Sequence, residues 1–351
     1  MKGIKNMKNH RSRYASFISV ILMLTFLLIS CGAGADSGCD SLSSVSGGST
    51  SSIPEDNAEI RFAVLNGTTG FGIAPLWSDV KNGGSKLNAK IDFYGDASLI
   101  PPMIISGNID AAAVPTNLAA VIYAKTSGNI KVLAVNTLGV LYLMENGTSV
   151  SCLADLKGKT VYVPGQNSNP EYVLKGLLSA AGLENDVTVD GTTYPSPDAL
   201  AAALAGGLAE VGVLPEPKVT ASVMQSGNGK LRVALDFTKE WKDTTGTDLV
   251  QGCLIVRKEY ADQHPDVINE FLKEYKSSVD TVNSDPQKSA GMIVSAGLAA
   301  KEALVVNALP RCNIVCMTGD DMKTSLNAFW KALYNVVPSS VGGSLPDDGI
   351  F

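Results

Sequence analysis

The feature that most constrains this chain is an alternation of short β-rich runs and helical segments that occurs twice. In the first series, helical segments separate strands at residues 60–65, 90–94, 111–114 and 131–135. In the second series, they separate strands at residues 160–163, 187–189, 210–214 and 231–235. Strands separated by helices at this spacing predict α/β units built on parallel sheets.

One segment shows the repeat directly. Residues 107–115 and 207–215 can be laid over each other, a hundred positions apart. Each has a glycine that ends a helix, an acidic residue, a buried strand, and a proline where the next helix opens. The simplest account is two lobes of the same design, and chance similarity of two generic β-turn-α units is the alternative.

The rest of the chain predicts how the two lobes are connected. A strand at 249–256 is followed by amphipathic helical stretches at 264–282, 287–296 and 322–336. We therefore expect the chain to return to the first lobe and brace it. The predicted fold has two α/β lobes, each a mostly parallel sheet with helices on both faces.

The predicted first lobe is residues 57–137 together with 250–351, and the second lobe is residues 138–249. The chain would cross between them at 137–143 and at 248–252. Two crossings form a hinge, and a hinge permits closure around a ligand.

The N-terminus has the layout of an export signal. Five basic residues between Lys2 and Arg13 precede an apolar run at 17–29, and no acidic residue comes before Asp36. The run is shorter than the roughly 20 residues of a membrane-spanning helix. It ends in Leu28-Ile29-Ser30-Cys31, which resembles the lipobox of bacterial lipoproteins.

We therefore predict a signal peptide at residues 1–30 and acylation of Cys31, with palmitate among the expected groups. An ordinary signal followed by a chance cysteine is the alternative. Residues 31–56 are rich in Ser and Gly and predict a flexible tether. Two acyl chains hold a soluble domain at a membrane, so the protein is expected outside the cytoplasm, facing the periplasm or the cell exterior.

Charge and cysteine content exclude some functions. The formal net charge is −6, and loss of the basic signal makes it more negative, which argues against a nucleic-acid partner. Cys312 and Cys316 lack a second Cys or His pair, so no metal or other cofactor is expected. Two alternatives stay open for the remaining thiols: buried free cysteines, or one disulfide among Cys152, Cys253, Cys312 and Cys316.

Small polar residues follow the predicted strands, where α/β sheets bind ligands. Glycines in these loops let backbone N–H groups approach a ligand closely. The loop at 67–72 is not a P-loop, because no Gly-Lys-Ser/Thr follows. The candidate ligand-binding residues are Thr68, Thr69, Gly70, Phe71, Gly72, Asp96, Thr116, Asn117, Gln166, Asn167, Ser168, Asn169 and Glu216.

Several of these residues have a structural alternative. Ser168 or Asn169 is also suited to cap the helix that follows, and Asp96 to cap a first helical turn. Glu216 lies between two prolines at a helix start, where a carboxylate is favoured by the helix dipole. The functional alternative is that Glu216 accepts hydrogen bonds from an amine or a heterocycle N–H.

Three segments carry a resemblance to a known family: residues 70–77, 106–111 and 153–161. They resemble the periplasmic-binding-protein fold of solute-binding lipoproteins, over roughly residues 57–340. The relatives serve nitrate, sulfonate and taurine importers or bind thiamine precursors of the pyrimidine type. The resemblance implies a monomeric solute-binding component of an ABC importer, with a membrane permease as partner and a cleft at the loops named above.

The loops also favour one class of solute. They contain no Lys or Arg, whereas Asp96 and Glu216 add negative charge. We therefore expect a neutral or amine-bearing organic solute, such as a pyrimidine-like compound, with a sulfonate- or nitrate-type anion as the alternative.

Two other functions stay open. Relatives of this fold act as enzymes in pyrimidine synthesis and in a menaquinone route, but His10 and His264 are the only histidines and His10 lies in the signal. We therefore expect no enzyme and no catalytic residues. A ligand-sensing lipoprotein would use the same cleft.

Overall fold

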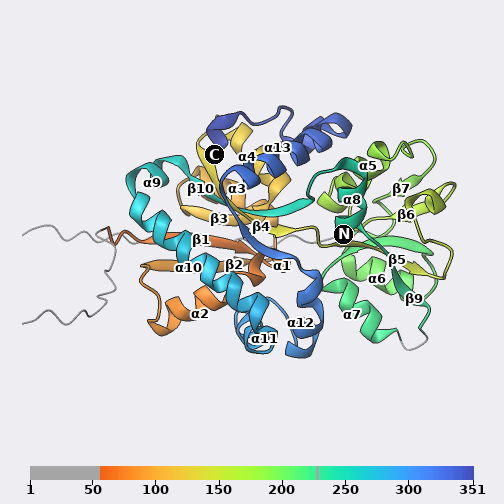
Figure 1. Ribbon diagram of the computed structural model, residues 1–351, viewed down its shortest axis with the longest axis horizontal. Helices are drawn as coiled ribbons and strands as arrows, with labels where there is room; N and C mark the ends of the chain where they lie inside the picture. Colours follow the sequence, from red (N-terminus) through yellow and green to blue (C-terminus); the bar gives the residue numbers. More distant parts are fainter. Residues whose placement is uncertain (1–55, 227–228) are drawn as a thin grey trace, which may run out of the picture. The chain divides into compact units, whose positions relative to one another are not determined.

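Two β-sheets organise the residues that the computed structural model describes, 56–226 and 229–351 (Figure 1). The first sheet has the order β11-β4-β10-β3-β1-β2, and the second has the order β7-β6-β8-β5-β9. The strands of the first sheet are β1 (Ile60–Leu65), β2 (Ala89–Tyr94), β3 (Ala111–Pro115), β4 (Ile130–Leu138), β10 (Val250–Arg257) and β11 (Ile314–Met317). Those of the second are β5 (Leu141–Asn146), β6 (Thr160–Tyr162), β7 (Thr188–Asp190), β8 (Val211–Pro215) and β9 (Leu231–Asp236).

The two sheets repeat one topology. In the first, β1 pairs in parallel with β2 and β3, and β10 lies antiparallel between β3 and β4. In the second, β6 pairs in parallel with β7 and β8, and β5 lies antiparallel between β8 and β9. The aligned segments 107–115 and 207–215 contain β3 and β8, which hold the same place in their sheets. The predicted α/β fold with helices on both faces is confirmed, and the inserted antiparallel strands make both sheets mixed.

Helices lie between and around the strands, as Figure 1 shows. Those before β9 are α1 (Thr68–Phe71), α2 (Ala74–Asn82), α3 (Ile100–Ile105), α4 (Thr116–Lys125), α5 (Asn169–Ala180), α6 (Pro197–Ala205) and α7 (Lys218–Gln225). The others are α8 (Phe237–Thr245), α9 (Lys258–Gln263), α10 (Pro265–Ser284), α11 (Pro286–Ser295), α12 (Glu302–Ala308) and α13 (Gly319–Val336). Short 3-10 turns include η1 (Ala97–Leu99), η2 (Leu153–Leu156), η3 (Leu309–Arg311), η4 (Pro338–Val341) and η5 (Asp348–Ile350).

The chain passes between the sheets twice. β4 ends at Leu138 and β5 begins at Leu141, so the first crossing is much shorter than the predicted 137–143. β5 escaped prediction because its residues are buried on both faces, which leaves no period-two alternation of apolar and polar side chains. The Val140 N–H donates to Gln251 Oε1 over 2.6 Å, so the two crossings lie side by side. The lobe boundaries at 137/138 and 249/250 stay predictions.

The C-terminal helices contact elements around both sheets. α10 packs on α2 and β11, as expected of a brace for the first lobe. α13, however, packs on α4 and also on α5. The Phe329 ring of α13 lies 5.4 Å from the Trp241 ring of α8. Beyond the expected brace for the first lobe, α13 therefore also packs on helices that cover the second sheet.

The cysteines of the described residues are free. They are Cys152, which is exposed, Cys316, which is half-buried, and Cys253 and Cys312, which are buried. Burial raises the pKa of the Cys253 and Cys312 thiols. No disulfide therefore joins these four, while Cys31, Cys39, the predicted signal and most of the predicted tether lie outside the described residues.

The described residues contain neither a helix suited to span a membrane nor a cluster of metal ligands. None of their helices has the length and hydropathy of a membrane span. Residues 56–226 and 229–351 contain no group of three or more His, Cys, Asp or Glu side chains arranged to hold a metal ion.

Candidate functional site

In each sheet the strand order reverses among the parallel strands, and such a point is where open α/β sheets bind ligands. In the first sheet this point lies between β1 and β3, and in the second between β6 and β8. Pro115 at the end of β3 pairs with Gly252 beside the second crossing, and Pro215 at the end of β8 pairs with Leu141 beside the first. Both points of reversal therefore lie next to the strands at which the chain crosses between the two sheets. We call this region the interlobe site.

The glycine-rich loop after β1 is packed into the protein. Phe71 is fully buried in the apolar cluster around β1 and α10. A Cβ at Gly70 would lie 2.8 Å from Leu298, and one at Gly72 would lie 2.7 Å from the Tyr275 hydroxyl. These glycines are required by close packing, so this loop offers little surface to a solute. Thr68 is also buried, and the Thr69 carbonyl accepts a 3.0 Å hydrogen bond from Asn136 Nδ2.

Asp96 and Thr116 both have partners within the protein. Asp96 is exposed and accepts a 2.9 Å hydrogen bond from the Ser98 N–H, which lowers the pKa of its carboxyl. Asp96 therefore caps the first turn of η1, which is the structural alternative given for it above. Thr116 is fully buried, and its hydroxyl donates to the Val250 carbonyl over 2.7 Å. That bond ties the start of α4 to the second crossing.

Three of the predicted residues carry buried polar atoms without a partner among the described residues: Asn117 Oδ1, Ser168 Oγ and Asn169 Oδ1. Ser168 occupies the N-cap position of α5 but makes no side-chain capping bond. The capping alternative is therefore not realised. Buried polar atoms without protein partners need water or a ligand.

Gln166 and Asn167 precede these residues and are exposed. The Asn167 N–H donates to the Glu171 carboxylate, and this bond fixes the turn before α5.

The sequence did not point to three further partnerless atoms: Thr238 Oγ1 and Gln251 Nε2, which lie beside the crossings, and Ser340 Oγ, from a residue that contacts Asn117. The Ser340 carbonyl accepts a 3.4 Å bond from Asn117 Nδ2. Thr238 lies against Gly139, and Gln251 accepts from Val140. Thr238 had a usable signal, because it is a polar residue two positions after the end of β9. Ser340 offered none, because it reaches the site through the fold of the C-terminal tail.

Glu216 is buried, and its carboxylate is held by its own helix. It accepts hydrogen bonds from the Thr220 N–H at 3.1 Å and the Thr220 hydroxyl at 2.8 Å. Burial raises the pKa of Glu216, while the Thr220 bonds and the charge of Arg311 act in the opposite direction. The contacts seen are those of a helix-start acid, and a role with solute stays a prediction.

Arg311 is the charged residue that the sequence did not point to. Its Nη1 atom lies 3.8 Å from Glu216 Oε1 and donates to Thr220 Oγ1 over 3.4 Å. The predicted loops contain no Lys or Arg, but Arg311 brings a positive charge to Glu216 from outside those loops. Arg311 comes from η3, far along the chain, and no local pattern connects it with Glu216.

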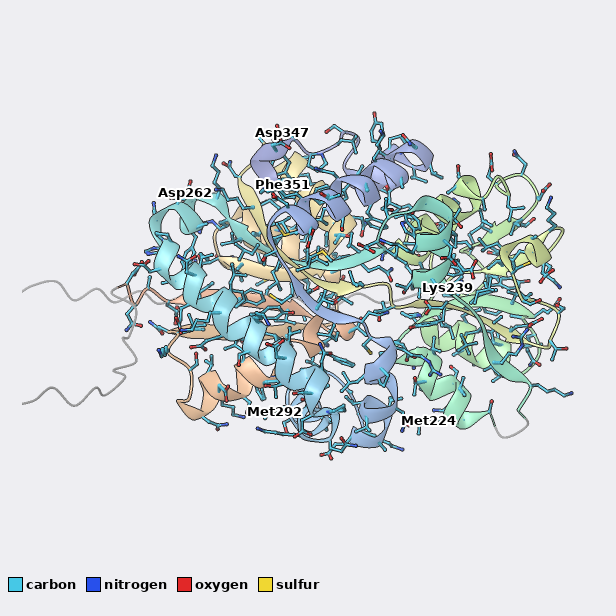
Figure 2. All side chains as sticks on the ribbon, viewed as in Figure 1. Met224, Lys239, Asp262, Met292, Asp347 and Phe351 are labelled. Carbon is cyan, nitrogen blue, oxygen red and sulfur yellow. The ribbon has the colours of Figure 1, made fainter. Side chains whose placement is uncertain are left out.

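A groove of about 370 Å³ lies next to this ion pair. It runs between α7 and the α12–η3 segment, and Met224 at its edge is labelled in Figure 2. Its lining residues are Thr220, Val223, Met224, Asn307, Pro310 and Arg311.

The sequence profile of the family described as NMT1/THI5 like matches residues 85–289, more than half of the chain. The chain belongs to the NMT1/THI5-like family. The family resemblance drawn from the three sequence segments is therefore confirmed. No curated protein sequence matches this NMT1/THI5-like protein.

Solved structures share its fold. An ABC transporter protein from Parabacteroides distasonis is 21% identical with a TM-score of 0.70, covering 84% of this chain and 99% of that one. The periplasmic aliphatic sulphonate binding protein of Escherichia coli is 16% identical with a TM-score of 0.65, covering 81% and 90%. The periplasmic nitrate-binding protein of Synechocystis is 15% identical with a TM-score of 0.50, covering 69% and 66%. At these identities the likeness establishes the two-lobed fold.

The site of this NMT1/THI5-like protein has a definite chemical character. Its partnerless atoms belong to uncharged amide and hydroxyl groups, which act as both donors and acceptors. Glu216 and Arg311 balance each other in charge. Such a site can bind and orient a polar molecule by hydrogen bonds.

Proposed function

We propose that this protein is the exported solute-binding component of an ABC importer and holds a small organic solute in the interlobe site. One observation carries the proposal: the strand-order reversals of both sheets lie at the crossings, with buried, partnerless polar atoms at Asn117, Ser168 and Asn169. Membership of the NMT1/THI5-like family and a fold shared with binding proteins of importers support it.

The anchor and the partner are part of this proposal. Cleavage before Cys31 and acylation of that cysteine would hold the protein at the membrane surface, beside its permease, as a monomer on the Ser/Gly-rich tether. Labelling of cells with a radioactive fatty acid tests the anchor. The wild type should incorporate label, and Cys31→Ser should incorporate none.

The solute is proposed to be neutral or amine-bearing, with pyrimidine-like compounds as candidates. The uncharged amide and hydroxyl groups of the interlobe site support this class. Two proteins of the same fold are named for aliphatic sulphonate and nitrate, so these anions belong in any test.

The deciding experiment is mass spectrometry of small molecules released from the purified protein, combined with thermal denaturation against a panel of pyrimidines, amines, sulfonates and nitrate. A bound solute at 100 times its Kd adds about 2.7 kcal/mol of stability. Asn117→Ala and Asn169→Ala should each weaken the response to the same solute about tenfold, as expected for loss of one buried hydrogen bond. The proposal would be contradicted if no compound of the panel raised the Tm and no small molecule was released from the purified protein.

We also propose that the protein does not transform its solute. His264, the one histidine of the described residues, is bound to Asp56 through a 2.6 Å contact of Nδ1. It belongs to the start of α10 and has no contact with the interlobe residues described above. Incubation of the identified solute with the protein should return it unchanged, and any product would overturn this part.

A further inference from the structure

The turn η3 joins the two lobes by polar contacts. The Tyr142 hydroxyl of β5 donates to the Arg311 carbonyl over 2.9 Å. The Arg311 guanidinium reaches Thr220 and Glu216 at the start of α7. Tyr142 belongs to β5 of the second sheet, and Glu216 and Thr220 follow β8 of that sheet. Arg311 ends η3, which comes shortly before β11 of the first sheet. The Arg311–Glu216 ion pair therefore spans the lobe boundary.

The two partners differ in their access to solvent. The Glu216 side chain is 0% exposed, whereas the Arg311 side chain is 44% exposed. Arg311 and Thr220 line the groove of about 370 Å³, and Glu216 does not. A molecule in the groove therefore meets Arg311 and Thr220 first, with the carboxylate behind them.

Glu216 depends on this arrangement for its charge balance. Thr220 supplies two hydrogen bonds but no charge. Lys218, two positions away, pairs with Asp198. Among the described residues, Arg311 is the cation that forms an ion pair with Glu216. A buried carboxylate without a positive partner is strongly unfavourable, so the position beside Glu216 is a subsite for a cation.

We propose that Arg311 occupies the cation subsite of Glu216 as an internal counter-ion and so narrows the proposed class of solute: protonated amines are excluded, and the interlobe site takes an uncharged solute. The inference rests on the proposed solute-binding function. A solute ammonium group would have to displace a guanidinium that the chain supplies at a high effective concentration. An uncharged solute does not compete for this position and can accept hydrogen bonds from the exposed part of the Arg311 guanidinium.

Removal of the internal guanidinium tests the proposal. Arg311→Ala leaves Glu216 without its counter-ion and a space of guanidinium size beside it, so the Tm should fall by about 4 °C. Saturating methylguanidinium should then raise the Tm of Arg311→Ala by about 2 °C or more. The wild type should not respond beyond an equal concentration of sodium chloride.

Two further variants identify the responsible carboxylate. The double variant Glu216→Gln/Arg311→Ala should not respond to methylguanidinium, because its negative charge is gone. Lys218→Ala is the matched control. It removes a cation of α7 that pairs with Asp198 within the second lobe, so this variant should not respond to methylguanidinium. If Arg311→Ala does not fold, Arg311→Gln keeps the test valid, with methylammonium as the smaller probe.

Two outcomes would overturn the proposal. In one, methylguanidinium raises the Tm of the wild type as much as it raises the Tm of Arg311→Ala. In the other, the folded variants lose stability but respond to neither cation, which would make the pair a structural tie alone. Neither outcome affects the proposed transport function, which depends on the solute released from the wild type.

Discussion

At the scale of single residues, Glu145 shows how a buried charge is compensated. Its side chain is 0% exposed, pairs with Arg232 and accepts from the Ser149 N–H and hydroxyl at 2.6 and 2.7 Å. Burial raises the pKa of Glu145, but these bonds and the Arg232 charge outweigh it and lower the pKa overall. A lowered folded-state pKa stabilises the protein above the unfolded pKa, and this stability is lost as pH falls through the folded value.

We therefore predict that Glu145→Gln lowers the free energy of unfolding by about 2 kcal/mol at pH 7. The difference from the wild type should shrink as the pH falls below about 4. Urea denaturation across this pH range measures it. Glu210→Gln, which removes a 57% exposed carboxylate paired with Lys159, is the control and should change stability little. A pH-independent loss in Glu145→Gln would contradict the electrostatic account.

At the scale of elements, α13 contacts both lobes. Phe329 and Trp330 are fully buried, and the Trp330 Nε1–H donates to the Thr116 carbonyl over 2.9 Å. Truncation of one ring in such a place leaves a cavity and costs about 3–5 kcal/mol. We predict that Phe329→Ala loses about this much stability and speeds hydrogen exchange in α5 and α8, because the ring packs on Trp241. Lys331→Ala, on the exposed face of the same helix, should leave both measurements unchanged.

At the scale of the whole molecule, the two crossings are the predicted hinge between the lobes. A Cβ at Gly139 would clash with the Thr238 hydroxyl and lie 2.9 Å from Leu249. Gly139→Ala should therefore push the two crossings apart, cost about 1–3 kcal/mol and alter solute affinity. Thr238→Ala should partly restore both properties in the double variant. Gly84→Ala, where a Cβ meets atoms at 3.7 Å, is the control. Equal effects of Gly139→Ala and Gly84→Ala on Tm and affinity would contradict a role for Gly139 in the hinge.

Much of the architecture could be predicted because it is encoded locally. The strand at Ala111–Pro115 and its counterpart at Val211–Pro215 follow from a helix-ending glycine, an apolar run and a proline, all adjacent in sequence. β5 could not be predicted in the same way, because a strand buried on both faces has no distinctive periodicity. The family also followed from short segments, since the residues that carry the resemblance are adjacent within each segment.

The sequence by itself determined the α/β repeat, the family and the positions of the polar loops, because each depends on residues close together in the chain. The tertiary structure alone decided what those loops do. It buried Phe71 in the core, left Asn117, Ser168 and Asn169 with partnerless atoms, and brought Arg311 to Glu216. The packing around Phe71 and the pairing of Arg311 with Glu216 join segments that are far apart in the chain, so the local pattern around each residue does not reveal its partner.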